Sequence, residues 1–210
     1  MTGSLPREQA ARTLLGLGEQ SLVLASASPR RADLLTGLGL TFSVCPANVD
    51  ETAPMGDPGL AAAYVAEKKA RTAARSGGSS LVIGADTVVV SGNQVLGKPE
   101  DRDHARRMLG DLSGRSHEVI TGLAVLREAD GTVTAGAERT RVGFRVLTVA
   151  DIDALVDSGE ADDKAGAYGI QSLASLVVDR VNGDYFNVVG LPLGLLGRLI
   201  REMSGHGGRV

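Results

Sequence analysis

Apolar residues along this chain alternate between short β-branched runs and longer stretches in which they recur at helical spacing. The short runs predict strands at residues 22–25, 41–44, 81–90 and 94–99. The longer stretches begin and end at capping and turn residues, and they predict helices at 8–17, 29–38, 57–75, 101–112, 148–156 and 193–203.

Turn sequences in the second half of the chain predict two β-hairpins. "ADGT" joins residues 117–128 to 133–147, and "NGD" joins 174–181 to 185–190. Together these elements predict an α/β fold with a mixed sheet whose antiparallel pairs lie in its second half. We expect residues 1–20 to be an N-terminal extension and residues 21–205 to form a single domain.

The composition excludes several classes of protein. The 210-residue chain is 43% hydrophobic and 22% charged, as in ordinary globular domains. A net charge of −3 argues against a dedicated duplex-binding protein, and six aromatic residues without Trp offer little for stacking single-stranded nucleic acid. Because no run is apolar and long enough for a signal peptide or a membrane span, we expect a cytoplasmic protein without membrane or nucleic-acid partners.

Several familiar chemistries are also missing. Cys45 is the only cysteine, which rules out an internal disulfide and favours a small core residue. The three histidines show no metal-ligand spacing. The sequence contains neither a P-loop nor a G-x-S-x-G elbow, so a nucleophilic-serine hydrolase is disfavoured.

The stretch "SASPRR", residues 26–31, predicts a phosphate site at a helix start. Ser28 suits the N-cap and Pro29 the first helical position, so free backbone N–H groups and the positive end of the dipole would face an anion. Arg30 and Arg31 oppose that dipole unless an anion neutralises them, and guanidiniums bind phosphate in a bidentate manner. The alternative is a solvated, slightly frustrated helix start.

Asp86 stands within the apolar run "LVIGADTVVV", where a buried charge is costly unless it is paired or metal-bound. Three interpretations stay open: a ligand of a hard divalent cation, a general base whose pKa burial raises, or a carboxylate that accepts hydrogen bonds from a loop. Glu51, in the acidic stretch "VDE", is a second candidate metal ligand, and a plain solvent-facing acid would look the same.

Lysines supply the remaining candidates. Lys98 lies between a glycine and a proline at a strand end, which fixes its direction. Lys68 and Lys69 lie on a predicted helix, where lysines ordinarily face solvent. The sequence therefore predicts a phosphate site of arginines and lysines that faces two or three carboxylates.

With these residues assembled, the sequence closely resembles the Maf family of nucleoside triphosphate pyrophosphatases. Eight stretches carry the resemblance, in family order over residues 21 to about 200: "LVLASASPRRADLL", "VDE", "EKKA", "IGADTVV", "LGKP", "SGRSHEVITGLAV", "DKAGAYGIQ" and "VNGDYFNVVGLP". The 20 residues before them have no counterpart in the family.

The resemblance implies hydrolysis of a nucleoside triphosphate between its α- and β-phosphates, with Mg²⁺ or Mn²⁺ as cofactor. It implies an elongated mixed-sheet α/β fold like that of inosine triphosphate pyrophosphatases, with two lobes around a central cleft, and a homodimer. By the same resemblance Asp86 is the proton acceptor, Glu51 is a second essential acid, and both are candidate metal ligands. The residues that would hold the triphosphate are Ser26, Arg30, Arg31, Lys69 and Lys98.

The form "AGAYGIQ" resembles the branch that acts on dTTP and UTP, whereas the 7-methyl-GTP branch has Glu at position 171. Arg30, Thr87 and Gln171 occupy the positions associated with that choice. An amide accepts from N3–H and donates to O4 of uracil or thymine, but a flipped amide suits cytosine equally well.

Two other functions stay open: a non-catalytic nucleotide-binding regulator of cell division, and a house-cleaning enzyme for modified nucleotides.

Overall fold

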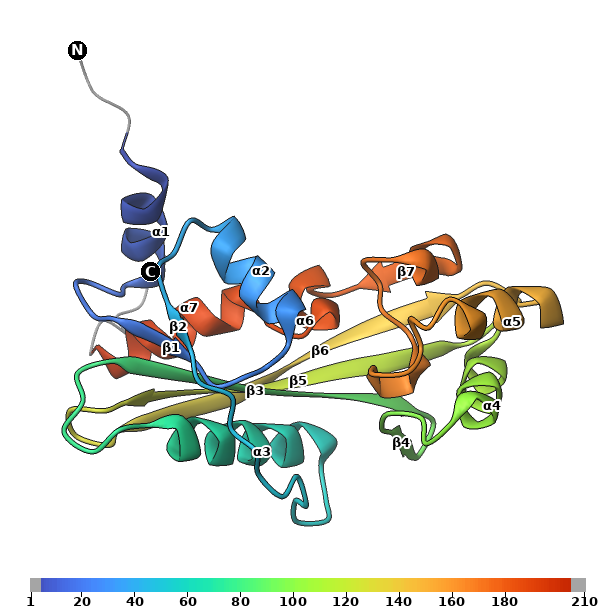
Figure 1. The fold of residues 1–210 in the computed structure, drawn as a ribbon, viewed down its shortest axis with the longest axis horizontal. Coiled ribbons are helices and arrows are strands. Elements are labelled where there is room, and N and C mark those ends of the chain that lie inside the picture. Colours follow the sequence, from blue (N-terminus) through green and yellow to red (C-terminus); the bar gives the residue numbers. More distant parts are fainter. Residues whose placement is uncertain (1–4, 205–210) are drawn as a thin grey trace.

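A mixed seven-stranded sheet runs along the molecule, in the order β2-β1-β3-β5-β6-β7 with β4 added to β3 (Figure 1). The computed structural model describes residues 5–204. Residues 1–4 of the predicted extension and residue 205 of the predicted domain lie outside this range. The strands are β1 Leu22–Leu24, β2 Ser43–Val44, β3 Leu81–Ser91, β4 Gln94–Leu96, β5 Ser116–Arg127, β6 Val133–Phe144 and β7 Val178–Asn182.

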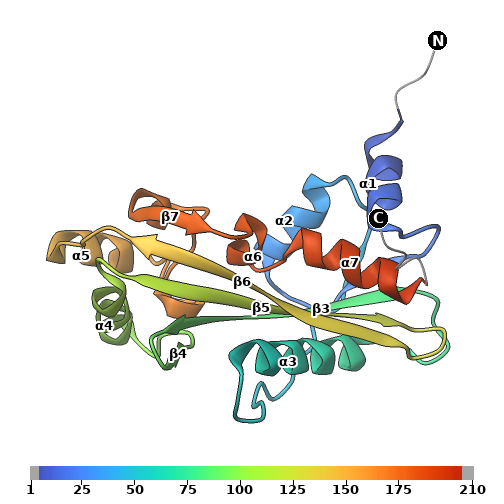
Figure 2. The same cartoon turned by 180° about the vertical axis from the view of Figure 1, so that it is seen from behind.

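Strand β1 pairs in parallel with β2 and β3, and the later pairs are antiparallel, as the sequence predicts. Seven α-helices accompany the sheet in the described range: α1 Arg7–Leu15, α2 Pro29–Gly37, α3 Pro58–Ala73, α4 Arg102–Leu112, α5 Val149–Asp157, α6 Tyr185–Val189 and α7 Leu193–Met203. Two short 3₁₀ helices, Ala165–Ala167 and Leu173–Leu176, lie between α5 and β7. Helix α3 lies on one face, and α2, α6 and α7 lie on the other (Figures 1 and 2). None of these helices is both long and apolar enough to cross a membrane.

Local signals explain where two of the helices begin. The Asp57 carboxylate accepts from the backbone N–H groups of Gly59 and Leu60 at the start of α3. Thr148 and Asp151 form a reciprocal capping box at the start of α5. Both helices begin where the sequence predicts.

The predicted second hairpin, 174–181 with 185–190, is wrong. Residues 178–182 form β7, which pairs with β6, and residues 185–189 form helix α6 instead of a strand. Short apolar runs do not distinguish strand from helix by their period. The deciding residue is Asp184, whose carboxylate accepts from Phe186 N and caps the helix.

The apolar core divides along the long axis of the molecule. One cluster joins α1, α2 and α7 to the sheet, with Leu24, Leu35 and Ile200 fully buried. A second cluster joins α4 and α5 to the far ends of the strands. This division agrees with the two lobes that the resemblance implies, and α1 of the extension packs into the first. Cys45, expected in the core, is half-buried at the edge of a third cluster under α3.

Strand β3 leaves part of one edge open between the lobes. Along one edge β3 pairs with β5 from Leu81 to Val90. Along the other edge β1 pairs with residues 81–83 and β4 with residues 89–91. Within the described residues, 84–88 therefore have no strand partner on this edge, and their polar groups are accessible to side chains and ligands.

Two glycines bring α3 unusually close to the sheet. A Cβ added at Gly84 of β3 would lie 2.0 Å from the carbonyl oxygen of Ala66 in α3. At Gly122 of β5, which is paired with Asp86, a Cβ would lie 2.0 Å from the carbonyl carbon of Ala62. The height of α3 over the sheet therefore depends on residues without side chains.

We expect Gly84→Ala to lower the free energy of unfolding by about 3 kcal/mol, the upper part of the usual cost of overpacking. Gly110→Ala in α4 is the matched control, because a Cβ there meets no atom of the described residues within 4 Å. It should be neutral or stabilising by up to about 1 kcal/mol. Urea denaturation of both variants measures their free energies of unfolding. Equal values for the two variants would contradict the close approach of α3 to β3 at Gly84.

Candidate active site

A cleft of about 800 Å³ opens at the unpaired edge of β3. It is lined by the end of β1, the start of α2, the loop around Glu51, the loop after β4 and the segment around Tyr168. The structure brings all the predicted site residues to this cleft: Ser26, Arg30, Arg31, Glu51, Lys69, Asp86, Thr87, Lys98 and Gln171.

The alternation of β3 distributes its polar residues between two helices. Successive side chains of a strand point to opposite faces, so Val82, Gly84 and Asp86 face α3. Ile83, Ala85 and Thr87 face the opposite layer, which contains α2 and α7. One strand thus presents a carboxylate to a lysine and a hydroxyl to an arginine.

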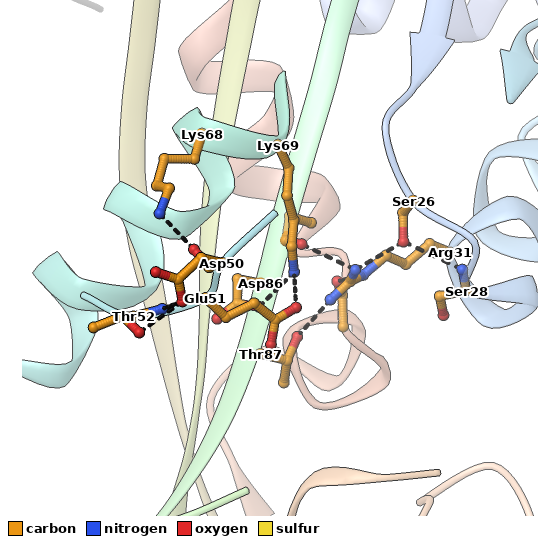
Figure 3. A network of polar contacts seen from close by, with 12 residues as sticks. Ser26, Ser28, Arg31, Asp50, Glu51, Thr52, Lys68, Lys69, Asp86 and Thr87 are labelled. Carbon is orange, nitrogen blue, oxygen red and sulfur yellow. Dashed lines mark hydrogen bonds and ion pairs between the residues drawn. The ribbon is translucent and has the colours of Figure 1, made fainter. Parts of the chain in front are cut away.

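Lys69 links the two predicted acids. Its ammonium nitrogen lies 2.8 Å from Oδ1 of Asp86 and 2.8 Å from Oε1 of Glu51 (Figure 3). The side chains of Lys69 and Asp86 are 11% and 13% exposed, whereas that of Glu51 is 63% exposed. The cation that compensates the charge of Asp86 is therefore Lys69 on α3.

Helical spacing explains why Lys69 is buried and Lys68 is not. The buried positions of α3 include Ala62, Val65, Ala66, Lys69 and Ala73, a stripe of one helix face. Lys69 therefore faces the sheet among small residues. Lys68 lies one position off this stripe, and its ammonium donates to the backbone oxygen of Asp50.

Glu51 is carried by a loop with its own turn structure. The Asp50 carboxylate accepts from the backbone and the hydroxyl of Thr52, which holds the pKa of Asp50 below its usual value. The hydrogen bond from Lys69 lowers the pKa of Glu51, and the charges of Lys98 and Arg31 add to this effect. The loop therefore presents an ionised Glu51 to the cleft near neutral pH.

Arg31 joins three segments of the first lobe. Its Nε donates to the Gly190 carbonyl at 2.8 Å, and its Nη1 donates to Ser26 Oγ at 2.9 Å and to the Ala85 carbonyl at 3.0 Å. Its Nη2 donates to Thr87 Oγ1 at 3.0 Å. Burial lowers the pKa of Arg31 to about 10, and the nearby Asp86 opposes this shift.

A chain of buried polar groups continues from Thr87 across the sheet. Thr87 Oγ1 lies 3.0 Å from Thr121 Oγ1, which donates to the Asn187 carbonyl. The Asn187 side chain is fully buried, and its amide donates to Val119 O and Thr140 Oγ1. Helix α6 is thereby fixed to β5, and the Gly190 carbonyl that receives Arg31 is fixed with it.

The remaining predicted residues lie on the rim of the cleft. Arg30 Nη1 pairs with Asp163 Oδ2 at 3.6 Å, which links α2 to the segment that leads to Gln171. Lys98 and Gln171 are exposed and line the cleft from the second lobe. The sequence did not single out Lys164, which also lines the cleft and lowers the pKa of Asp163 through a hydrogen bond.

The sequence also did not single out Thr121, Asn187 or the pair of His117 and Tyr168. A signal for Asn187 existed, because it interrupts the apolar run "YFNVVG" as Asp86 interrupts its own. Thr121 carries no such signal, since threonine is common in strands. His117 carries none either, because its partner Tyr168 lies 51 positions away.

The donor set of the cleft fits a divalent cation that also binds substrate. Within residues 5–204, no group of three or more His, Cys, Asp or Glu side chains is arranged to hold a metal ion. Glu51 and Asp86 converge on one nitrogen, so their oxygens are close enough to act together. One or two carboxylates completed by phosphate oxygens are a usual site for Mg²⁺.

Comparison with known proteins places this architecture in a family. The model of the family described as Maf-like protein matches residues 21–203. The chain is 50% identical over 171 residues to a dTTP/UTP pyrophosphatase of Syntrophomonas wolfei, which covers 81% of this chain and 90% of that protein. Proteins of the same name from Moorella thermoacetica and Aquifex aeolicus are 51% and 41% identical, over 82% and 87% of this chain and 89% and 95% of their own. The chain belongs to the Maf-like protein family.

Proposed function

We propose that this protein hydrolyses UTP and dTTP between the α- and β-phosphates and releases pyrophosphate. The observation that carries the proposal is the buried Lys69 ammonium between Asp86 and Glu51, in a cleft that also contains the start of α2. Acids and cations that converge in this way suit phosphoanhydride hydrolysis. The names of the relatives, dTTP/UTP pyrophosphatase, support the same substrates.

The start of α2 would receive the triphosphate. Ser28 occupies the N-cap, but its hydroxyl makes no capping bond, so a phosphate oxygen can take that place. The Arg31 guanidinium donates four hydrogen bonds to protein acceptors. We therefore assign it a mainly structural and long-range electrostatic role. Lys98 and Lys69 remain as the cations nearest to Glu51 that a phosphate chain can approach.

Asp86 would act as the general base. Its Oδ1 accepts from Lys69, and its Oδ2 has no hydrogen-bond partner in the described part of the chain, so it can accept a proton from water. Water adds to the α-phosphorus, the bond to the bridging oxygen breaks, and pyrophosphate leaves with the negative charge. General-base assistance is worth about 10²–10⁴-fold, so positioning and charge stabilisation must supply most of the rate.

Mg²⁺ or Mn²⁺ would be held by Glu51 and the phosphates, with Asp86 as a second candidate ligand. When bound, the cation would neutralise phosphate charge that otherwise repels the carboxylates and the negative charge that develops on the attacking oxygen. Lys69 keeps both acids oriented toward the same place before substrate arrives. Lys69 and Lys98 stabilise the pyrophosphate as it leaves.

Gln171 is our candidate for reading the base, since its amide can satisfy both N3–H and O4 of uracil or thymine. Thr87 acts differently, because its hydroxyl is already engaged by Arg31 and Thr121. We assign Thr87 the role of orienting Arg31. Arg30 contributes through its pair with Asp163, which joins α2 to the segment that carries Gln171.

A regulator of cell division that only binds nucleotides would use the same cleft. It gains nothing from two acids beside the phosphates, because carboxylates repel a triphosphate unless a cation intervenes. The relatives are named as pyrophosphatases, so the enzyme is favoured. A house-cleaning activity toward modified pyrimidine nucleotides would use the same residues.

We expect the protein, with Mg²⁺ or Mn²⁺, to release pyrophosphate from UTP and dTTP faster than from CTP, and the release to stop when EDTA is added. A coupled assay for pyrophosphate over a panel of nucleotides that includes modified pyrimidines measures this preference.

Asp86→Asn should lower kcat by about 10²–10⁴-fold in the same assay, because an amide cannot take the proton from water. Asp111→Asn, exposed on α4, is the control and should match the wild type. Near-normal turnover by a folded Asp86→Asn variant would contradict the assignment of Asp86 as the general base.

The adjacent lysines allow a matched test of the central ion pairs. Lys69→Met should lower the free energy of unfolding at neutral pH by about 3 kcal/mol, because it leaves the buried Asp86 carboxylate without its cation. The same variant should lose most of its activity. Lys68→Met should change little, since its partner is an exposed backbone oxygen. Urea denaturation and pyrophosphate release compare the two.

The same variants have an expected pH dependence. Lys69 lowers the pKa of Glu51 below its ordinary value of about 4.5. The contribution of this ion pair to the free energy of unfolding is therefore complete above the ordinary pKa, and it is lost as the pH falls through the lowered pKa. The stability gap between wild type and Lys69→Met should therefore narrow in acid. A gap that widens in acid would contradict the pairing.

A further inference from the structure

The segment that carries Gln171 is built into the protein by an uncommon set of contacts. Gly166 N donates to the Gly97 carbonyl at 3.0 Å, which ties the segment to the loop of Lys98. Ala167 has φ 62°, the only positive value among the described non-glycine residues. An alanine keeps a left-handed backbone only where its surroundings enforce it.

Tyr168, the residue after Ala167, makes a contact that can hold the backbone of Ala167 in this conformation. The Tyr168 hydroxyl lies 2.7 Å from Nε2 of His117, a bond between the cleft segment and the central strand β5. Both side chains are buried, at 7% and 2% exposed. Tyr168 lines the cleft as well, so this bond joins the cleft lining directly to the sheet.

Ring packing fixes the pair in three dimensions. The His117 ring meets Tyr168 edge-on with centroids 5.4 Å apart, and Phe144 of β6 meets both rings at 5.1 and 4.8 Å. Such edge-to-face contacts prefer one mutual orientation. The Tyr168 ring therefore has little freedom to rotate or to withdraw from the cleft.

Within the described part of the chain, His117 makes no polar side-chain contact other than this bond. Its Nδ1 is buried and has no hydrogen-bond partner within residues 5–204. Burial lowers the pKa of His117 to about 4, so the ring is neutral near pH 7, and burial also raises the pKa of the Tyr168 hydroxyl. A core position that only needed packing would be better filled by an apolar ring, because an unsatisfied buried nitrogen is costly.

We propose that His117 is a positioning residue for base selection, which fixes the turn from Tyr168 to Gln171 through its bond to the Tyr168 hydroxyl. Gln171 lies three residues beyond Tyr168, and an amide reads uracil or cytosine according to which of its ends meets the base. A turn that is held in place keeps the Gln171 amide at one position beside the base, as precise recognition requires. This proposal rests on the proposed nucleotide hydrolysis and deepens it by naming what makes the site selective between UTP and CTP.

The test uses Tyr168→Phe, which removes the hydroxyl and keeps the ring. We expect the ratio of kcat/KM for UTP over CTP to fall by about fivefold, the scale of one lost neutral hydrogen bond. The change should lie mainly in KM, because Asp86, Lys69 and the start of α2 are untouched. Tyr64→Phe, exposed on α3 and outside the cleft, is the matched control and should leave the ratio unchanged.

A double variant separates positioning from simple stability. His117→Phe combined with Tyr168→Phe removes both polar partners, so much of the stability that Tyr168→Phe loses should return. The selectivity should stay low, since the bond is still missing. Recovery of selectivity together with stability would overturn the proposal, as would a wild-type ratio in a folded Tyr168→Phe.

Hydrogen exchange of the ligand-free protein supplies a readout that does not depend on catalysis. Amides of residues 166–171 should exchange about fivefold faster in Tyr168→Phe than in the wild type, and those of α7 should not change. Unchanged exchange in 166–171 would overturn the positioning role. Absence of pyrophosphate release by the wild type would instead overturn the proposed function alone.

Discussion

The structure of the site depends on one ammonium group, that of Lys69, which lies 2.8 Å from an oxygen of each of two carboxylates. Without this cation Asp86 would be a buried charge in an apolar strand and Glu51 an acid on a solvent-facing loop. With it, the strand, the helix and the loop share one electrostatic centre. A site that must bind a polyanion is thereby able to keep two acids in it, because the positive charge offsets their repulsion.

The fold creates the space for that centre in two ways. Gly84 and Gly122 let α3 approach the sheet so closely that Lys69 reaches Asp86 from a helix face made mostly of alanine. The gap between β1 and β4 leaves the middle of β3 open at one edge, where the Ala85 carbonyl is taken by Arg31 instead of by a strand. Arg31 and the buried Asn187 then connect this edge to α2 and α6. The cleft is thus a consequence of sheet topology, and its polar lining is held by residues that serve the fold.

Much of this could be predicted from the sequence. Apolar spacing indicates the strands and most helices, and Asp86 is recognisable because a charge within a β-branched run requires a partner. The partner itself is less accessible: the spacing of Ala62, Ala66 and Ala73 places Lys69 on the buried stripe, but a lysine on a helix ordinarily faces solvent. The second hairpin was wrong because a short apolar run fits either period, and the cap at Asp184 decided the outcome. The bond between His117 and Tyr168 joins residues 51 positions apart, and nothing local in the sequence indicates it.

In the proposed reaction water attacks the α-phosphorus beside Asp86, and the fate of the water oxygen shows which phosphorus is attacked. UTP is hydrolysed by the protein in water enriched in ¹⁸O, and the products are separated and weighed by mass spectrometry. We expect the label in UMP and unlabelled pyrophosphate. Label in the pyrophosphate, or release of inorganic phosphate in its place, would contradict attack on the α-phosphorus, because the attack would then fall on the β- or γ-phosphorus.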